Sequence, residues 1–246
     1  MKHESIAMVE PLQTSAPVLA GKRADLVERI AANAAERRQL MIEALGGDVS
    51  DALKFIEKGM PQSLLFMVEI IPLIHKLYMH EPQNIKKTAL DVGPQNFAGT
   101  QLLSQVHSDE SYTKLKLSVS ALDITRRFEQ FKDIVAPETE FLVSDIFDVK
   151  GRAWDFIIAS HVIEHVHEPL KFVRQLQSLA HDFVIIACPW NEFPLTTAQH
   201  VTTVTKELTR QMGARDLQIF TNYSWGKTRE VCLFWLPGAN VKKTAS

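Results

Sequence analysis

The chain has 246 residues, of which 46% are hydrophobic, and its formal net charge at pH 7 is −2. This size and balance describe a globular chain with room for one large α/β domain and an appendage. They count against nucleic acid as the main partner, and the two cysteines, Cys188 and Cys232, are too few for a disulfide scaffold or a four-cysteine zinc site.

The apolar segments are too short or too polar to cross a membrane. The longest, residues 63–78, carries Glu69, His75 and Lys76, whereas a spanning helix needs about 20 mostly apolar residues. The N-terminal residues 1–10 lack the apolar stretch of a secretory signal. With the two thiols, these features predict a cytoplasmic protein with no membrane partner.

The N-terminal third is predicted to be helical. Residues 1–20 lack hydrophobic periodicity and are expected to be a flexible lead-in. Helices are then predicted at 22–45, 51–57 and 61–79. Pro72 is expected to kink or split the last of them. We treat 21–82 as a helical segment that forms either a lid over a substrate pocket or an apolar surface buried against the main domain or a second subunit, as in a homodimer.

Strand and helix patterns alternate through the remaining domain, 83–246. The predicted strands are 88–92, 115–122, 140–143, 154–159, 183–187, 217–221 and 230–235. The predicted helices are 97–107, 126–134, 169–180 and 205–212. This alternation is typical of a doubly wound α/β fold, with a mostly parallel seven-stranded sheet, helices on both faces and the last two strands as an antiparallel hairpin at the edge.

The first strand of this domain runs into a glycine-containing turn, within the stretch TALDVGPQNFAGT at 88–100. Gly93 permits a turn that a side chain would obstruct, and Gly99 is expected to let the next helix pack close to the strand. Such a turn presents backbone N–H groups at a helix start to a ligand. The alternative is an ordinary strand-to-helix connection.

Polar residues follow the predicted strands where each one ends: Gly93, Asp123, Asp145, His161 and Asn191. In an open parallel sheet, ligands bind in the crevice outside these carboxyl ends. Asp123 suits a ribose diol because one carboxylate can accept from both hydroxyls, and Asp145 could accept from an adenine amino group. Either acid could instead cap the turn or helix that follows it.

Four segments, LDVGPQNFAG, LSVSALDI, FLVSDIFD and WDFIIASHVIEHVHEP, resemble the successive motifs of the class I S-adenosylmethionine-dependent methyltransferases. The resemblance covers about 87–235 and implies S-adenosylmethionine as the cofactor. It places the methionine portion at the first turn, the ribose at the acid ending the second strand, the adenine at the acid ending the third, and the reaction site after the fourth. The implied cofactor-binding residues are Asp91, Gly93, Pro94, Gln95, Gly99, Asp123, Ile124, Asp145, Ile146, Ser160 and His161.

The chain departs from the family pattern in two places. The first turn lacks the middle glycine of GxGxG, and bulkier residues stand there instead. The separation of Asp91 and Asp123 also exceeds the usual spacing, which makes Asp109 a second candidate for the ribose acid.

The chemistry implied by the resemblance needs alignment more than covalent catalysis, because a sulfonium methyl is already activated. A hydroxyl acceptor must also lose its proton, and an imidazole has the ordinary pKa for that role. The candidate catalytic residues are His161 and His200, with Glu164. We expect a small-molecule substrate, an oxygen of a metabolite or sugar. A noncatalytic binding protein and a nicotinamide-dependent oxidoreductase are the alternatives.

The stretch 161–167, HVIEHVH, also raises the question of a metal site. His161 and His165 would share a face if this stretch were helical. However, it follows a strand and ends at Pro169, which leaves little helix to hold the two imidazoles rigid. We therefore predict no metal from the sequence, with His161 facing the ligand and His165 packing or hydrogen-bonding nearby.

Overall fold

The computed structural model describes residues 58–126, 128–195, 197–222 and 229–239, with positions 32, 35, 36, 38–40, 42 and 43. The described positions before residue 44 are helical. The predicted lead-in and the rest of the predicted helices before residue 58 lie outside the described residues. Within the described part, no helix combines the length and apolar character that a membrane span requires.

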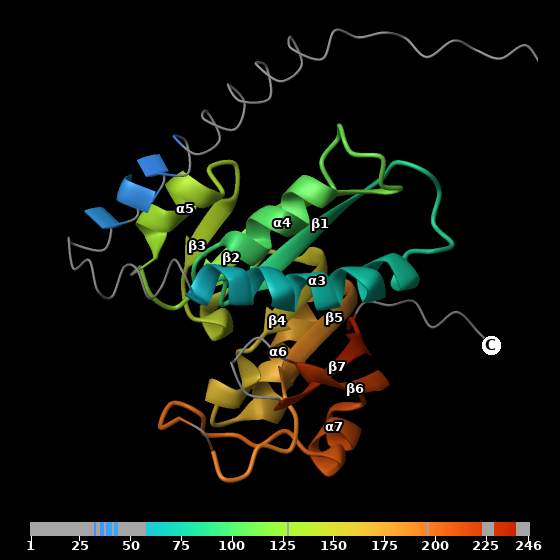
Figure 1. Ribbon diagram of the computed structural model, residues 1–246. Helices are drawn as coiled ribbons and strands as arrows, with labels where there is room; N and C mark the ends of the chain where they lie inside the picture. Colours follow the sequence, from blue (N-terminus) through green and yellow to red (C-terminus); the bar gives the residue numbers. More distant parts are fainter. Residues whose placement is uncertain are drawn as a thin grey trace, which may run out of the picture.

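A seven-stranded sheet forms the centre of the molecule (Figure 1). Its strands are β1 (Ile85–Val92), β2 (Leu115–Asp123), β3 (Glu140–Val143), β4 (Trp154–Ser160), β5 (Ala180–Pro189), β6 (Arg215–Asn222) and β7 (Arg229–Pro237). They lie in the order β3-β2-β1-β4-β5-β7-β6, with β1 to β5 parallel and β7 antiparallel to both neighbours. The predicted doubly wound fold with an antiparallel hairpin at one edge is confirmed.

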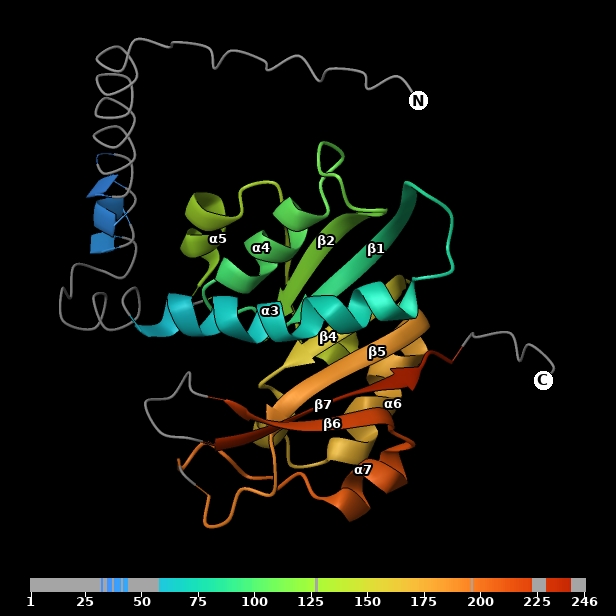
Figure 2. The ribbon, with the colours of Figure 1, turned by 45° about the vertical axis from the view of Figure 1, so that its right-hand side comes forward.

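Helices cover both faces of this sheet (Figures 1 and 2). On one face lie α3 (Met60–Leu77), α4 (Ala98–Val106) and α5 (Glu129–Val135), and on the other lie α6 (Pro169–Leu179) and α7 (Lys206–Met212). The central strands are apolar at successive positions because both of their faces are covered. In β1, for example, Ala89 packs toward α3 and Leu90 toward α6, and both are fully buried.

Helix α3 lies across the sheet and is part of its core (Figure 2). Its buried side chains, Met67, Ile70, Leu73 and Ile74, pack in one cluster with residues of β1, β4 and β5. The helix is continuous through Pro72, so the predicted split is wrong. Burial of its apolar face stabilises the helix through a position where proline removes one backbone hydrogen bond.

Several element boundaries differ from the prediction by a few residues, and two of the differences have a local reason. Strand β5 extends on both sides of the predicted 183–187, since it pairs with β4 on one side and β7 on the other. Helix α5 begins at Glu129, three residues late, because Thr125 is held in a turn by the Asp123 side chain.

Strands β1 and β4 are neighbours at the centre of the sheet. From β1 the chain continues to β2 and β3 on one side, and from β4 it continues to β5 on the other side. This reversal in strand order opens a crevice outside their carboxyl ends.

Candidate active site

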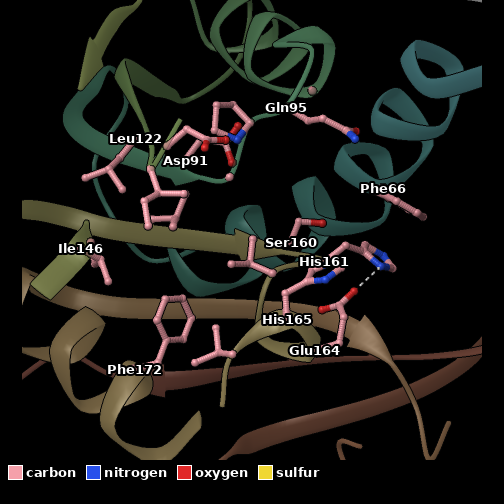
Figure 3. A pocket seen from close by; sticks show the side chains of 18 of the residues that line it. Phe66, Asp91, Gln95, Leu122, Ile146, Ser160, His161, Glu164, His165 and Phe172 are labelled. Carbon is pink, nitrogen blue, oxygen red and sulfur yellow. Dashed lines mark ion pairs between the residues drawn. The ribbon is translucent and has the colours of Figure 1, made fainter. Parts of the chain in front are cut away.

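A cavity of about 870 Å³ lies at the carboxyl ends of β1 to β4 (Figure 3). Its volume is within the range of small-molecule sites, about 300–1,000 Å³. The residues predicted for the cofactor and for catalysis all line it: Asp91, Gly93, Pro94, Gln95, Gly99, Asp123, Ile124, Asp145, Ile146, Ser160, His161, Glu164 and His200. The fold therefore brings together side chains that are up to about a hundred positions apart in the chain.

The turn after β1 forms without the middle glycine. Gly93 has φ +73°, and a Cβ there would lie 2.6 Å from Cγ2 of Val162, so glycine is required on both counts. Gln95 and Phe97 also adopt left-handed conformations, with φ of 51° and 60°. Such a conformation costs a residue other than glycine about 1–2 kcal/mol. The fully buried Phe97 ring, packed edge-on against Phe141, holds the turn in place.

Gly99 has a different role from the one predicted. A Cβ at this position would lie 3.1 Å from the carbonyl oxygen of Ser63 and 3.5 Å from Met67, both in α3. The glycine therefore permits close contact between α4 and α3, and the prediction of a close contact with the strand is wrong. The sequence could not identify this neighbour because α3 precedes the sheet.

Asp91 is a buried carboxylate at the start of this turn. It is 4% exposed, and the Thr100 hydroxyl donates to its Oδ2 at 2.6 Å. Burial raises the pKa of Asp91 to about 6, and the hydrogen bond from Thr100 opposes this. A cationic ligand group beside Asp91 would favour its ionised form.

The acids that end β2 and β3 both cap local turns and line the cavity. Asp123 Oδ1 accepts from the backbone N–H of Thr125 at 2.9 Å, and Asp145 Oδ1 accepts from that of Phe147 at 3.0 Å. Burial raises the pKa of Asp123. Because a carboxylate has about four acceptor positions, each acid keeps capacity for a ligand.

Two other predicted residues do not reach the cavity. Asp109 pairs with Lys86 at 3.1 Å near the amino end of β1, whereas the cavity lies at the carboxyl ends of the strands. The prediction of Asp109 as a second candidate for the ribose acid is therefore wrong. Asn191 follows β5, but its backbone N–H donates to the carbonyl of Val204 and it does not line the cavity.

His161 is fixed at the end of β4. Its φ is 56°, and its backbone N–H donates to the carbonyl of Ala187 at 2.7 Å. The imidazole stacks on Phe66 of α3, with ring centroids 3.6 Å apart, and its Nδ1 lies 3.4 Å from Oε1 of Glu164 (Figure 3). Sequence reasoning missed Phe66 because nothing in the apolar pattern of α3 distinguishes it from a core residue.

His200, a predicted catalytic residue, lines the same cavity. The backbone N–H groups of Val201 and Thr202 both donate to the carbonyl of Glu164, which ties the His200 loop to the segment after β4. His200 Nδ1 lies 2.5 Å from Oε2 of Glu192. Thr205 accepts from the N–H of Leu208 and caps α7 itself, so His200 has no role as the cap of that helix.

Glu192 and Arg229 were not predicted as site residues. Arg229 lines the cavity, and its Nη1 lies 3.3 Å from Oε1 of Glu192. The salt bridge favours the ionised carboxylate that holds the His200 ring. No motif marks either residue, because they come from the loop after β5 and from the edge hairpin.

Residues 90–182 match the family described as "Methyltransferase domain". This family match confirms the resemblance found in the sequence motifs. No curated protein matches the chain.

Several solved structures share the fold at low sequence identity. The N-methyltransferase NodS from Bradyrhizobium japonicum WM9, in complex with S-adenosylhomocysteine, is 10% identical with TM-score 0.54, covering 82% of this chain and 98% of its own. The 1,6-didemethyltoxoflavin-N1-methyltransferase of Burkholderia thailandensis is 14% identical with TM-score 0.52, covering 94% and 92%. The magnesium protoporphyrin IX methyltransferase of Synechocystis PCC 6803 is also 14% identical, with TM-score 0.51, covering 73% and 87%. At these identities the similarity establishes the fold.

Proposed function

We propose that the chain is a class I methyltransferase that transfers the methyl group of S-adenosylmethionine to an oxygen of a small metabolite or sugar. S-adenosylmethionine is the cofactor that this domain implies. The observation that carries the proposal is that one cavity is lined both by acids suited to a nucleoside, at the ends of β1, β2 and β3, and by the imidazoles of His161, after β4, and His200.

We propose that the cofactor occupies the part of the cavity over β1, β2 and β3. The turn at Gly93 would hold the methionine portion, with Asp91 near its cationic groups. Asp123 would accept from the ribose hydroxyls, and Asp145 with Ile146 would lie by the adenine. The left-handed turn supports this placement, since it leaves Gln95 lining the cavity.

The acceptor would then lie near Ser160, His161 and His200. His200 resembles an oriented catalytic imidazole: its Nδ1 is held by Glu192, so its Nε2 is the nitrogen left for an acceptor. Orientation by a carboxylate is the arrangement that lets an imidazole handle a proton. This cluster is the reason for proposing an oxygen acceptor, because a hydroxyl must lose a proton whereas a neutral amine can attack unaided.

The structural neighbours include enzymes named as N-methyltransferases, so the fold does not select between oxygen and nitrogen. A methyl-transfer assay does. The protein would be incubated with methyl-labelled S-adenosylmethionine and paired small molecules that differ only in carrying a hydroxyl or an amine. We expect label in the hydroxyl member, and label confined to amines would contradict the proposal.

Two histidine variants test the acceptor end of the cavity. His161→Gln and His200→Gln should each lower turnover by about 10²–10⁴-fold if the imidazole handles the acceptor proton. The affinity of the His200→Gln variant for S-adenosylhomocysteine should stay near that of the wild type, because His200 lies away from the proposed nucleoside end. Full turnover in both variants would mean that alignment alone carries the reaction.

We also propose a cytoplasmic location, no nucleic-acid or membrane partner, and a homodimer formed through the N-terminal helices. The location is supported by the two buried thiols, Cys188 and Cys232, whose sulfurs are 3.4 Å apart and unbridged. The exposed apolar side chains of α3, Leu64, Leu65 and Val68, support a partner on that face.

A further inference from the structure

We propose that Glu164, His165 and His200 bind one divalent transition-metal ion at the acceptor end of the cavity. One ligand atom from each lies within 4.8 Å of the other two. Glu164 and His165 stand on the short 3-10 turn Ile163–His165, and His200 arrives on the loop before α7. The third ligand could not be inferred from the sequence pattern, because 35 positions of chain separate it from His165.

Both histidines are oriented as metal ligands are. His165 Nδ1 lies 3.0 Å from the carbonyl oxygen of Gln199, and a carbonyl can only accept, so Nδ1 carries the proton and Nε2 the lone pair. His200 Nδ1 is held by the carboxylate of Glu192 in the same way. A hydrogen bond from the second ring nitrogen to a carbonyl or carboxylate is the usual support of a metal-bound histidine.

Glu164 supplies the negative charge of the site. The residue is 2% exposed, and its Oε2 is buried with no hydrogen-bond partner among the residues described. Its other oxygen faces His161 at 3.4 Å (Figure 3). A buried carboxylate oxygen without a partner is costly, and a cation beside it removes that cost.

Binding requires only a small closure of the three side chains. Ligands about 2.1 Å from a tetrahedral ion lie about 3.4 Å from one another. His165, the exposed member of the three, has the most room to move, whereas Glu164 is held by burial and His200 by its contact with Glu192.

Two imidazoles and one carboxylate favour zinc, manganese, iron or cobalt over magnesium or calcium, which take oxygen ligands. Such a set leaves at least one coordination position open. If the proposed function holds, an acceptor hydroxyl bound there would lose its proton more readily, because a metal ion lowers the pKa of a bound oxygen. His200 would then act as a ligand that holds the ion.

The test uses the full-length, tag-free protein, treated with a chelator and then titrated with Zn²⁺ by calorimetry and with Co²⁺ by visible absorption. We expect one ion per chain, with a Co²⁺ spectrum of a site that contains nitrogen ligands. Glu164→Gln, His165→Gln and His200→Gln should each weaken Zn²⁺ binding at least 100-fold. Glu192→Gln, which changes only the support of a ligand, should weaken it by about 10–100-fold.

The matched control is His167→Gln, an exposed histidine two positions from His165 that is outside the cluster. It should bind Zn²⁺ like the wild type. Absence of stoichiometric binding by the wild type, or equal binding by the wild type and His165→Gln, would overturn the proposal. Because His165 is exposed, its replacement leaves the core intact, and circular dichroism would verify this.

These titrations need neither cofactor nor acceptor. A protein that binds S-adenosylhomocysteine but no metal would overturn the metal site and leave the methyltransferase proposal standing. A protein that binds metal but transfers no methyl group would overturn the methyltransferase proposal and leave the metal site standing.

Discussion

Replacing Asp123 by alanine should weaken binding of S-adenosylhomocysteine, which keeps the nucleoside of the cofactor but cannot react. Asp123 ends β2 on the cavity wall, and one of its oxygens already accepts from the Thr125 N–H. The remaining acceptor positions would receive the ribose hydroxyls. Hydrogen bonds to a charged acceptor contribute about 1.5–3 kcal/mol, which corresponds to a rise in Kd of about 10- to 150-fold.

Two controls separate the ribose contact from the turn. Asp123→Asn keeps an oxygen for the Thr125 N–H and should bind with intermediate affinity while its thermal midpoint stays at the wild-type value. Asp109→Ala removes an acid that lies outside the cavity and should leave binding unchanged. Calorimetric titration of the three variants gives the comparison. Wild-type affinity in Asp123→Ala would refute the assignment of the ribose acid.

Three further predictions follow from the site and the core. Burial raises the pKa of Asp91 to about 6, so the affinity for the cationic cofactor should rise about tenfold between pH 5 and pH 8 as this carboxylate ionises. The Asp91→Asn variant should lose this dependence on pH. An equal dependence on pH in both proteins would contradict the contact between Asp91 and the cofactor. Gly93→Ala should destabilise the fold by about 1–3 kcal/mol more than Gly151→Ala does, since both glycines have positive φ but only the first meets a neighbour; equal denaturant midpoints would remove the steric argument. Deleting residues 1–80 removes α3 and its four buried side chains, whose burial contributes about 6–12 kcal/mol to stability, and should yield aggregated protein. Deleting residues 1–57 should keep the sheet domain folded. Sedimentation of the two truncated proteins tests this difference, and equal behaviour would contradict the role of α3 in the core.

The fold was predictable because its signals are local. Short apolar runs separated by helical periodicity identified the strands. The side chains that end β1 to β4 line one cavity because parallel strands carry their carboxyl ends to the same side of the sheet. The same logic failed for Asn191, whose position after β5 falls beyond the cavity and whose N–H is taken by Val204.

What could not be predicted depends on contacts between distant segments. Gly99 was assigned to the wrong neighbour because its closest atom belongs to α3, which no pattern connects to the first turn. The stacking of Phe66 on His161 and the salt bridge between Glu192 and Arg229 arise in the same way. Side chains of this kind acquire their roles only when the helix and the edge hairpin close over the strand ends.

The central claim is that the cavity over β1 to β4 binds S-adenosylmethionine. Calorimetric titration of the wild-type protein with S-adenosylmethionine, S-adenosylhomocysteine and NAD tests it most directly. We predict that the first two bind at one per chain and that NAD does not. Binding of NAD alone would contradict the claim in favour of an oxidoreductase, and binding of none of the three would contradict it in favour of a noncatalytic protein.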